Sequence, residues 1–199
     1  MATITAETVK ALREKSGAGV MECKRALEET GGDLDKAVAL LKERGQAAAA
    51  KRAGRDARDG QVASYIHTGG RIGVLIEVNC ETDFVARTDE FQRLVRDLAI
   101  QVAGLRPTYV SIESIPAADL DAKRAELLAA DMLAGKPEAI RGQIVEGQLK
   151  KWFSEVVLLE QPFRDQDRTV GQLVVEAISK TGENMRVRRF VRFELGEEI

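Results

Sequence analysis

The chain has few of the residues that build disulfide frameworks and metal sites. Its 199 residues include 2 cysteines and 1 histidine. Cys23 and Cys80 lie in unrelated segments and form no CxxC motif, so no disulfide framework is expected and a reducing, cytoplasmic location is favoured. With His67 as the single histidine, a multi-histidine metal site is excluded. We therefore expect the protein to bind no metal ion and no cofactor.

Motifs typical of catalysis and of membrane insertion are also missing. The sequence has no Walker-type phosphate loop, no GxGxxG and no nucleophile elbow. No apolar run approaches the ~20 residues that a membrane span needs. Glu7, Lys10 and Arg13 interrupt the first apolar residues, which argues against a signal peptide. These absences favour a binding or regulatory protein without a membrane partner over an enzyme, so no catalytic residues are expected.

Charge is nearly balanced, with 30 Lys and Arg against 32 Asp and Glu, and aromatic residues make up 5% of the chain. A dedicated nucleic-acid binder needs an excess of basic charge and often stacking aromatics, so we expect no direct nucleic-acid partner. One local basic cluster leaves an RNA- or ribosome-binding surface open as an alternative to a solvated helix face. Its members are Lys42, Arg44, Lys51, Arg52, Arg55 and Arg58.

Residues 1–45 have the pattern of three short helices. Their boundaries are marked by capping residues and glycines, namely Thr5, Ser16 to Gly19, Gly31-Gly32, Asp33 and Gly45. So small a bundle has a thin core and cannot enclose a cofactor, and we interpret it as a partner-docking domain. Residues 46–60 are rich in Ala, Lys and Arg with almost no apolar face, which predicts an exposed helical basic linker.

The pattern of residues 61–199 predicts an α+β domain that forms the core and mediates dimerisation. The expected strands are 61–67, 71–79 and 184–195, and the expected helices begin near 88, 117, 137 and 170, with Pro162 ending the third of them. The first two strands form a hairpin around Thr68-Gly69-Gly70. The fold class is therefore a three-helix bundle followed by a small three-stranded antiparallel sheet packed with helices on one face.

The opposite face of this sheet is not wholly polar. Period-two alternation predicts that it includes Tyr65, Leu75 and Phe190. A half-apolar second face on so small a sheet indicates coverage by a second copy of the chain, and a mixed solvent face is the alternative.

The segment from Asn79 to Arg87 lies where the second strand turns into a helix. Thr82 or Asp83 could be a helix N-cap there, with Phe84 as an ordinary core anchor. Strand-to-helix junctions are usually exposed and often functional, so an acid beside a large aromatic could also be a contact site. The local pattern alone favours the cap and the core anchor, because capping signatures are far commoner than functional Asp-Phe pairs.

Several motifs occur along the chain in a fixed order. They are Leu12-Arg13, Ser16 to Met21, Cys23-Lys24, Glu77 to Ala86, Glu155 to Phe163, Gly182-Glu183-Asn184 and Arg188-Arg189-Phe190. Together they resemble the bacterial elongation factor Ts family, whose members exchange guanine nucleotide on elongation factor Tu. The resemblance covers essentially the whole chain.

The resemblance implies a ubiquitin-associated-like N-terminal domain and an α+β core that both grip elongation factor Tu, in its GDP-bound and nucleotide-free states. It implies that Thr82, Asp83, Phe84 and Val85 intrude beside the partner's nucleotide and displace its Mg²⁺. In the N-terminal helices, Val20, Met21 and Lys24 are candidates for partner contact, although Val20 could simply be core. Longer family members carry two core subdomains and an inserted coiled-coil hairpin. This chain has room for one core only and is similar to the short, homodimeric form.

Overall fold

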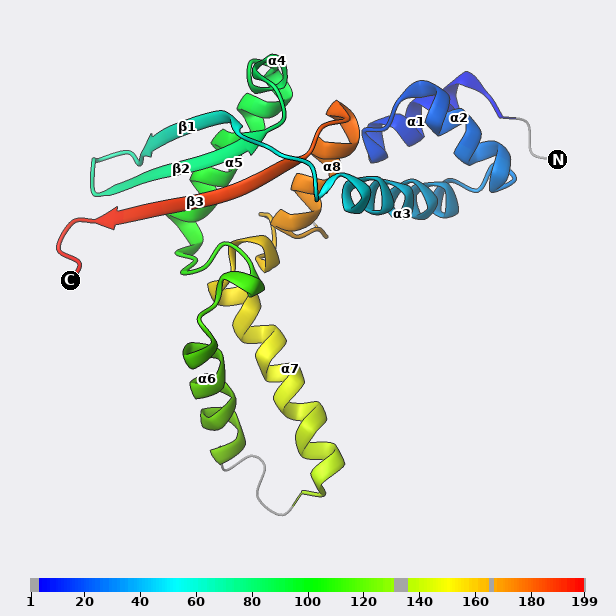
Figure 1. The fold of residues 1–199 in the computed structure, drawn as a ribbon. Helices are drawn as coiled ribbons and strands as arrows, with labels where there is room; N and C mark the ends of the chain where they lie inside the picture. The colour runs from blue at the N-terminus through cyan, green and yellow to red at the C-terminus, as the bar shows by residue number, and fades with distance from the viewer. Residues whose placement is uncertain (1–3, 131–135, 165–166, 199) are drawn as a thin grey trace. The chain divides into compact units, whose positions relative to one another are not determined.

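The computed structural model describes residues 4–130, 136–164 and 167–198 of an α+β protein, which confirms the predicted fold class (Figure 1). Its elements follow in the order α1 (Ala6–Ser16), α2 (Val20–Glu29), α3 (Leu34–Arg52), β1 (Asp59–Ile66), β2 (Ile72–Cys80), α4 (Asp83–Ala86), α5 (Asp89–Leu105), η1 (Ile112–Ser114), α6 (Ala117–Ala129), α7 (Glu138–Val156), η3 (Leu158–Glu160), α8 (Val170–Thr181) and β3 (Met185–Glu194).

The chain forms two compact units, each assembled from segments that are distant in sequence. Unit 1 comprises Met1–Gln61, Val78–Leu94 and Leu173–Arg186. Unit 2 comprises Val62–Glu77, Val95–Gln172 and Val187–Ile199. The three strands, α5 and α8 therefore each contribute residues to both units.

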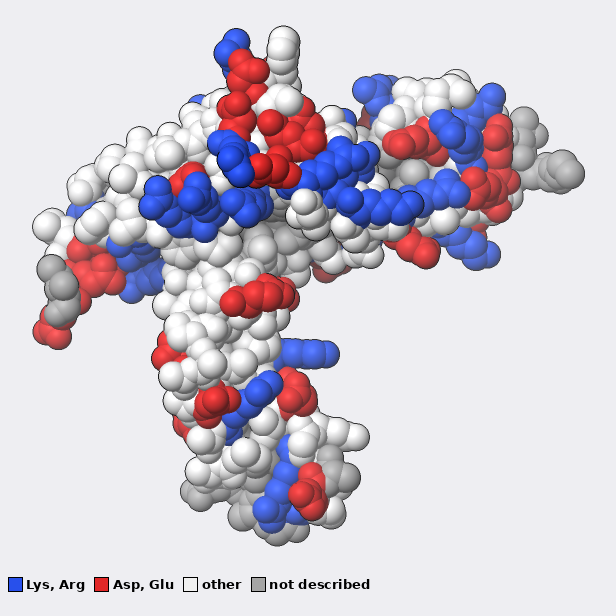
Figure 2. All heavy atoms as spheres, in the orientation of Figure 1, with Lys and Arg blue, Asp and Glu red and all other residues white. Residues whose placement is uncertain are grey.

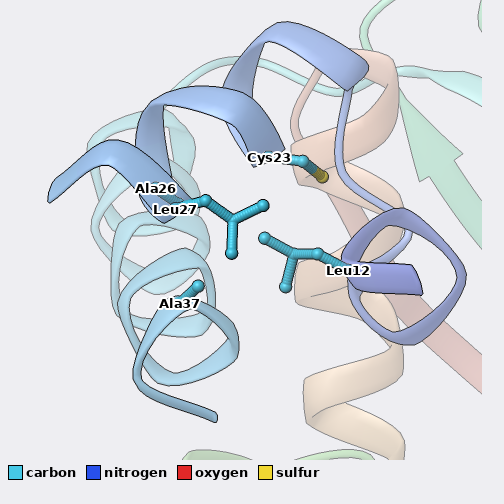
Figure 3. Packing of buried hydrophobic residues seen from close by; sticks show 5 residues of the cluster. All are labelled: Leu12, Cys23, Ala26, Leu27 and Ala37. Carbon is cyan, nitrogen blue, oxygen red and sulfur yellow. The ribbon is translucent and has the colours of Figure 1, made fainter. Parts of the chain in front are cut away.

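Local signals define the helices α1 to α3 of unit 1. Thr5 and Asp33 cap α1 and α3 through their side chains, and Gly17 ends α1 in the left-handed conformation with φ 67°. A fully buried apolar cluster joins the three helices, formed by Leu12, Cys23, Ala26, Leu27 and Ala37 (Figure 3). The predicted bundle is present, with the thin core expected of so few residues.

Helix α3 does not end at Gly45, so the predicted boundary there is wrong. The helix continues to Arg52, and it buries Gly45 and Ala49. A single glycine costs a helix only about 1 kcal/mol, and the run Gln46 to Ala50 consists of strong helix formers that offset this cost. The predicted linker is therefore partly a continuation of α3 with a buried side, and not an exposed helix of its own.

The sheet has the strand order β1-β2-β3, with β2 in the centre. The predicted hairpin is confirmed, because His67 N–H donates to the carbonyl of Ile72 at 2.9 Å across the turn. On β2, Val74 and Ile76 are buried and Leu75 between them is exposed. Arg192 of β3 donates to the carbonyl of Ala103 in α5 at 3.3 Å, so α5 lies on the face toward which Arg192 points (Figure 1).

The alternation along β3 slips by one residue, which corrects the predicted second sheet face. Arg188 and Arg189 are exposed in succession, and both bond the carboxylate of Glu77, at 3.1 and 2.7 Å. Beyond the slip, Phe190 and Arg192 are half-buried, and the large side chains of the alternate positions are exposed. Phe190 therefore does not belong to the open face, contrary to the sequence interpretation.

Tyr65 is also misplaced in the predicted face. A Cβ atom on Gly73 would lie 3.2 Å from Ile66 Cδ1, so Ile66 shares a face with Gly73 and Leu75. Tyr65, adjacent to Ile66, then points to the other face and is half-buried. Of the three predicted residues only Leu75 lies on the open face. Its apolar members, together the outer sheet face, are Val62, Ile66, Leu75, Val191, Phe193 and Leu195.

Helices α6 and α7 of unit 2 pack side by side as an antiparallel hairpin (Figure 1). Val145 and Leu149 are buried between them and contact Leu120, Trp152 and Phe153. Helix α7 ends at Val156, so the prediction that it continues to Pro162 is wrong. The chain leaves the helix early because Tyr109 and Val157 form a parallel β-bridge, and Tyr109 N–H donates to the Val156 carbonyl at 2.9 Å.

Candidate functional site

The junction after β2 folds into a separate one-turn helix, α4. Thr82 is its N-cap, and Thr82 Oγ1 accepts from the backbone N–H of Val85 at 3.4 Å. Helix α5 starts on its own cap, because Thr88 Oγ1 accepts from the N–H of Phe91 at 3.3 Å. Residues Thr82 to Val85, the tip, are therefore held outside the longer helix that follows.

Phe84 is the most exposed large apolar side chain of the described residues, with 82% of its surface accessible. The alternative reading of Phe84 as a core anchor is therefore wrong. Thr82 and Asp83 are also exposed, whereas Val85 is buried and anchors the tip to the protein's own core. Of the four predicted residues, three are available to a partner.

The acid of the tip is paired with a base one turn further on. Arg87 Nη2 lies 2.5 Å from Asp83 Oδ2, and both side chains are more than half exposed. Such a surface pair contributes at most about 1 kcal/mol to stability. The pair also cancels the charge of Asp83, so the tip presents little net charge beside Phe84.

The base of the tip is a hydrogen-bonded junction within unit 1. Thr82 donates to the Glu183 carboxylate from its backbone N–H at 3.0 Å and from its hydroxyl at 2.7 Å. Asn184 N–H donates to Glu81 Oε1 at 2.6 Å. Cys80, just before, is buried and donates from Sγ to the Thr82 carbonyl at 3.1 Å.

Burial raises the pKa of the Cys80 thiol to about 11, and the negative charges of Glu183 and Asp59 add to this. The thiol is therefore protonated at neutral pH and acts as a hydrogen-bond donor, not as a nucleophile. Sequence reasoning missed the roles of Glu81 and Glu183. The Gly182-Glu183-Asn184 motif was the available signal, but nothing local connects it with Thr82, a hundred residues earlier.

The docking candidates of α2 lie at its start. Val20 and Met21 are 51% and 60% exposed, and Lys24 follows one turn later and is exposed. The reading of Val20 as a core residue is therefore wrong. The core positions of this helix are Cys23, Ala26 and Leu27.

The basic cluster is partly neutralised. Figure 2 shows lysine and arginine side chains along α3 with acidic side chains beside them. Arg44 pairs with Glu29, Arg55 with Glu81 and Arg58 with Asp56. Half of the cluster's six charges are thus engaged within the protein, which disfavours the RNA-binding alternative.

Among residues 4–130, 136–164 and 167–198, no group of three or more His, Cys, Asp or Glu side chains is placed to hold a metal ion. Within the same ranges, no helix is both long and apolar enough to cross a membrane.

Comparison with known proteins identifies the family. The profile described as Elongation factor TS matches residues 2–197. The chain belongs to the elongation factor Ts family.

The protein named Elongation factor Ts of Moorella thermoacetica is 57% identical over 198 residues, covering 98% of this chain and 97% of the relative. That of Heliobacterium modesticaldum is 56% identical, with 98% and 92% covered. That of Cyanothece sp. is 54% identical, with 100% and 76% covered. Members of the elongation factor Ts family act in translation elongation, and the family match covers nearly the whole chain.

Proposed function

We propose that the chain is a guanine-nucleotide exchange factor for elongation factor Tu and that its tip displaces the Mg²⁺ ion of the partner. Family membership supports the exchange role. The observation that carries the tip's part is the 82% exposure of Phe84 on a one-turn helix capped by Thr82. A side chain this apolar is normally buried, so its presentation at a junction favours a contact role.

The proposed mechanism is displacement of the ion without chemistry on this chain. Mg²⁺ demands near-ideal octahedral geometry and bridges the bound phosphates to the partner's ligands. Phe84 is large and stiff, so it can occupy a cleft beside the site and move a ligand by about an ångström. Asp83 is paired with Arg87, so we assign the displacement to the bulk of Phe84 and a positioning role to Asp83.

Exchange requires only that the factor binds the nucleotide-free partner more tightly than the GDP-bound one. By linkage, nucleotide weakens the factor's binding as much as the factor weakens nucleotide binding. Each tenfold weakening corresponds to about 1.4 kcal/mol of differential contact. We propose that Val20, Met21 and Lys24, in a ubiquitin-associated-like docking domain of residues 1–45, supply part of the binding energy. Such a factor is not an enzyme, and it would act in the cytoplasm, where elongation takes place.

The test is release of fluorescent GDP from purified elongation factor Tu in the presence of excess unlabelled GDP. We expect the chain to accelerate release in a saturable manner, and we expect added Mg²⁺ to oppose the acceleration. A release rate that stays at its spontaneous value across micromolar concentrations of the chain would end the proposal.

We propose further that a second copy covers the outer sheet face, as in the short form that the sequence resembles. This face presents Val62, Ile66, Leu75, Val191, Phe193 and Leu195, all from unit 2 and each more than 40% exposed. A contiguous apolar surface of this kind is unusual on a monomer and self-complementary by symmetry in a two-fold dimer.

The Phe193→Asp variant is expected to convert the dimer to a 21.8 kDa monomer, because a charge would be buried at the interface. Sedimentation velocity at micromolar concentration measures this directly. Phe193 is 66% exposed in the single chain, so the substitution should leave the fold intact. Leu128→Asp on α6, also an exposed position, is the matched control. A wild-type chain that sediments as a monomer would dispose of the dimer.

A further inference from the structure

We propose that Glu183 is a positioning residue for the tip: its carboxylate orients Thr82 so that α4 presents Phe84 in one conformation. The expected effect on nucleotide exchange rests on the proposed function. The expected effect on the conformation of the tip concerns the free protein alone. Glu183 lies in the turn between α8 and β3, a hundred residues from the tip in sequence and in direct contact with it within unit 1.

The geometry determines which way the Thr82 hydroxyl points. An ionised carboxylate can only accept hydrogen bonds, so the hydroxyl must donate its proton to Glu183 Oε1 at 2.7 Å. Its lone pairs are then left for the N–H of Val85, the first capping bond of α4. The second carboxylate oxygen accepts the backbone N–H of Thr82 at 3.0 Å, which fixes the residue before the turn begins.

A reciprocal contact holds the Glu183 segment in turn. Glu81 Oε1 accepts the N–H of Asn184 at 2.6 Å, and Asn184 Nδ2 donates to the Arg55 carbonyl at 2.9 Å. Glu183 thus accepts the backbone N–H of Thr82, which follows Glu81, and Glu81 accepts the backbone N–H of Asn184, which follows Glu183. This double clamp joins the end of β2 to the turn after α8, where Gly182 has φ 77°.

The tip needs this external support because α4 is only four residues long. A single helical turn is unfavourable by itself, since several dihedral angles are fixed for one hydrogen bond. The capping bond at 3.4 Å is long, and Phe84 is too exposed to be held by packing. Buried Val85 anchors the tip on one side, and the two hydrogen bonds from Thr82 to Glu183 fix its base, which sets the direction of Phe84.

The first measurement uses the free protein. Glutamine at 183 keeps one oxygen to accept the Thr82 N–H but offers an amide N–H to the hydroxyl, so in Glu183→Gln the hydroxyl loses its charge-assisted acceptor and its lone pairs no longer serve Val85 alone. We expect amide hydrogen exchange at Thr82 and Val85, followed by NMR, to become about tenfold faster, as for a lost hydrogen bond. Thr82→Val should have the same effect at Val85, and Thr82→Ser, which keeps the hydroxyl, should not. Glu43→Gln, an exposed glutamate of α3, is the control.

The second measurement separates positioning from stability. With folded, saturating Glu183→Gln, the maximal rate of GDP release from elongation factor Tu should fall about tenfold, and the half-saturating concentration should stay within about twofold. Adding Thr82→Val to Glu183→Gln should lower the rate little further, because both act through one bond. Unchanged amide exchange at Thr82 and Val85 overturns the proposal, and so does faster amide exchange with an unchanged maximal rate. A wild-type chain that releases no GDP overturns the proposed function instead, and amide exchange then decides whether Glu183 holds the tip.

Discussion

Replacing Phe84 with alanine is expected to lower the maximal acceleration of GDP release about a hundredfold. A buried aromatic anchor at a protein interface is typically worth 2–4 kcal/mol, and about 2.7 kcal/mol corresponds to a factor of a hundred. The effect should appear at saturating factor, because a wedge that acts on the ion works only after the complex has formed. Stability should be unchanged, since 82% of the side chain is exposed in the free protein.

Fluorescent GDP release and thermal unfolding, measured on the same preparations, check this expectation. Leu128→Ala is the matched control, because Leu128 is a large apolar side chain that is 59% exposed and lies on α6, away from the tip in sequence. Asp83→Ala should reduce release less than Phe84→Ala, since it removes a side chain already paired with Arg87. Equal maximal rates for Phe84→Ala and wild type would show that Phe84 is not the wedge.

Replacing Gly60 with alanine is expected to lower the free energy of unfolding by about 3 kcal/mol or more. A Cβ atom on Gly60 would lie 2.2 Å from the Val78 carbonyl oxygen and 2.7 Å from the Cα of Asn79. These are backbone atoms of the paired strand β2, so they cannot move aside as a flexible side chain would. Gly60 also has φ 132°, a conformation that costs any other residue additional strain.

Urea unfolding followed by circular dichroism measures the change. Gly54→Ala is the matched control, because a Cβ atom there meets nothing within 4 Å. Its free energy of unfolding should stay within about 0.5 kcal/mol of wild type, as for most exposed substitutions. Equal midpoints for the two variants would contradict the close approach of β1 and β2 at Gly60.

Where nearby residues determine the end of a helix, the sequence interpretation and the structure agree. The ends of α1 follow from Thr5 and Gly17, and α8 begins at Val170, where the sequence predicts a helix start. Capping and left-handed glycines act within a few residues, so they are visible without the rest of the fold. Gly45 shows the limit of this reasoning. A glycine that can end a helix does so only when nothing beyond it favours continuing.

The sequence interpretation assigned Tyr65 and Phe190 wrongly to the outer sheet face. Period-two alternation assigns faces only while the register is unbroken, and the two consecutive exposed residues Arg188 and Arg189 mark a break in it. The slip is visible only in the burial of the folded strand, so the residues around Phe190 do not reveal it. The half-apolar character of the face was still apparent, because exchanging Phe190 for Val191 and Phe193 leaves it apolar.

The sequence by itself determined the family and the α+β class, because ordered motifs and local caps are visible without tertiary information. Only the tertiary structure decided that Phe84 points to solvent while Val85 is buried, and that Glu183 holds Thr82 from a hundred residues away. Exposure and long-range hydrogen bonds are properties of neighbours in space, and nothing in the residues next to Thr82 encodes which distant turn will lie beside it.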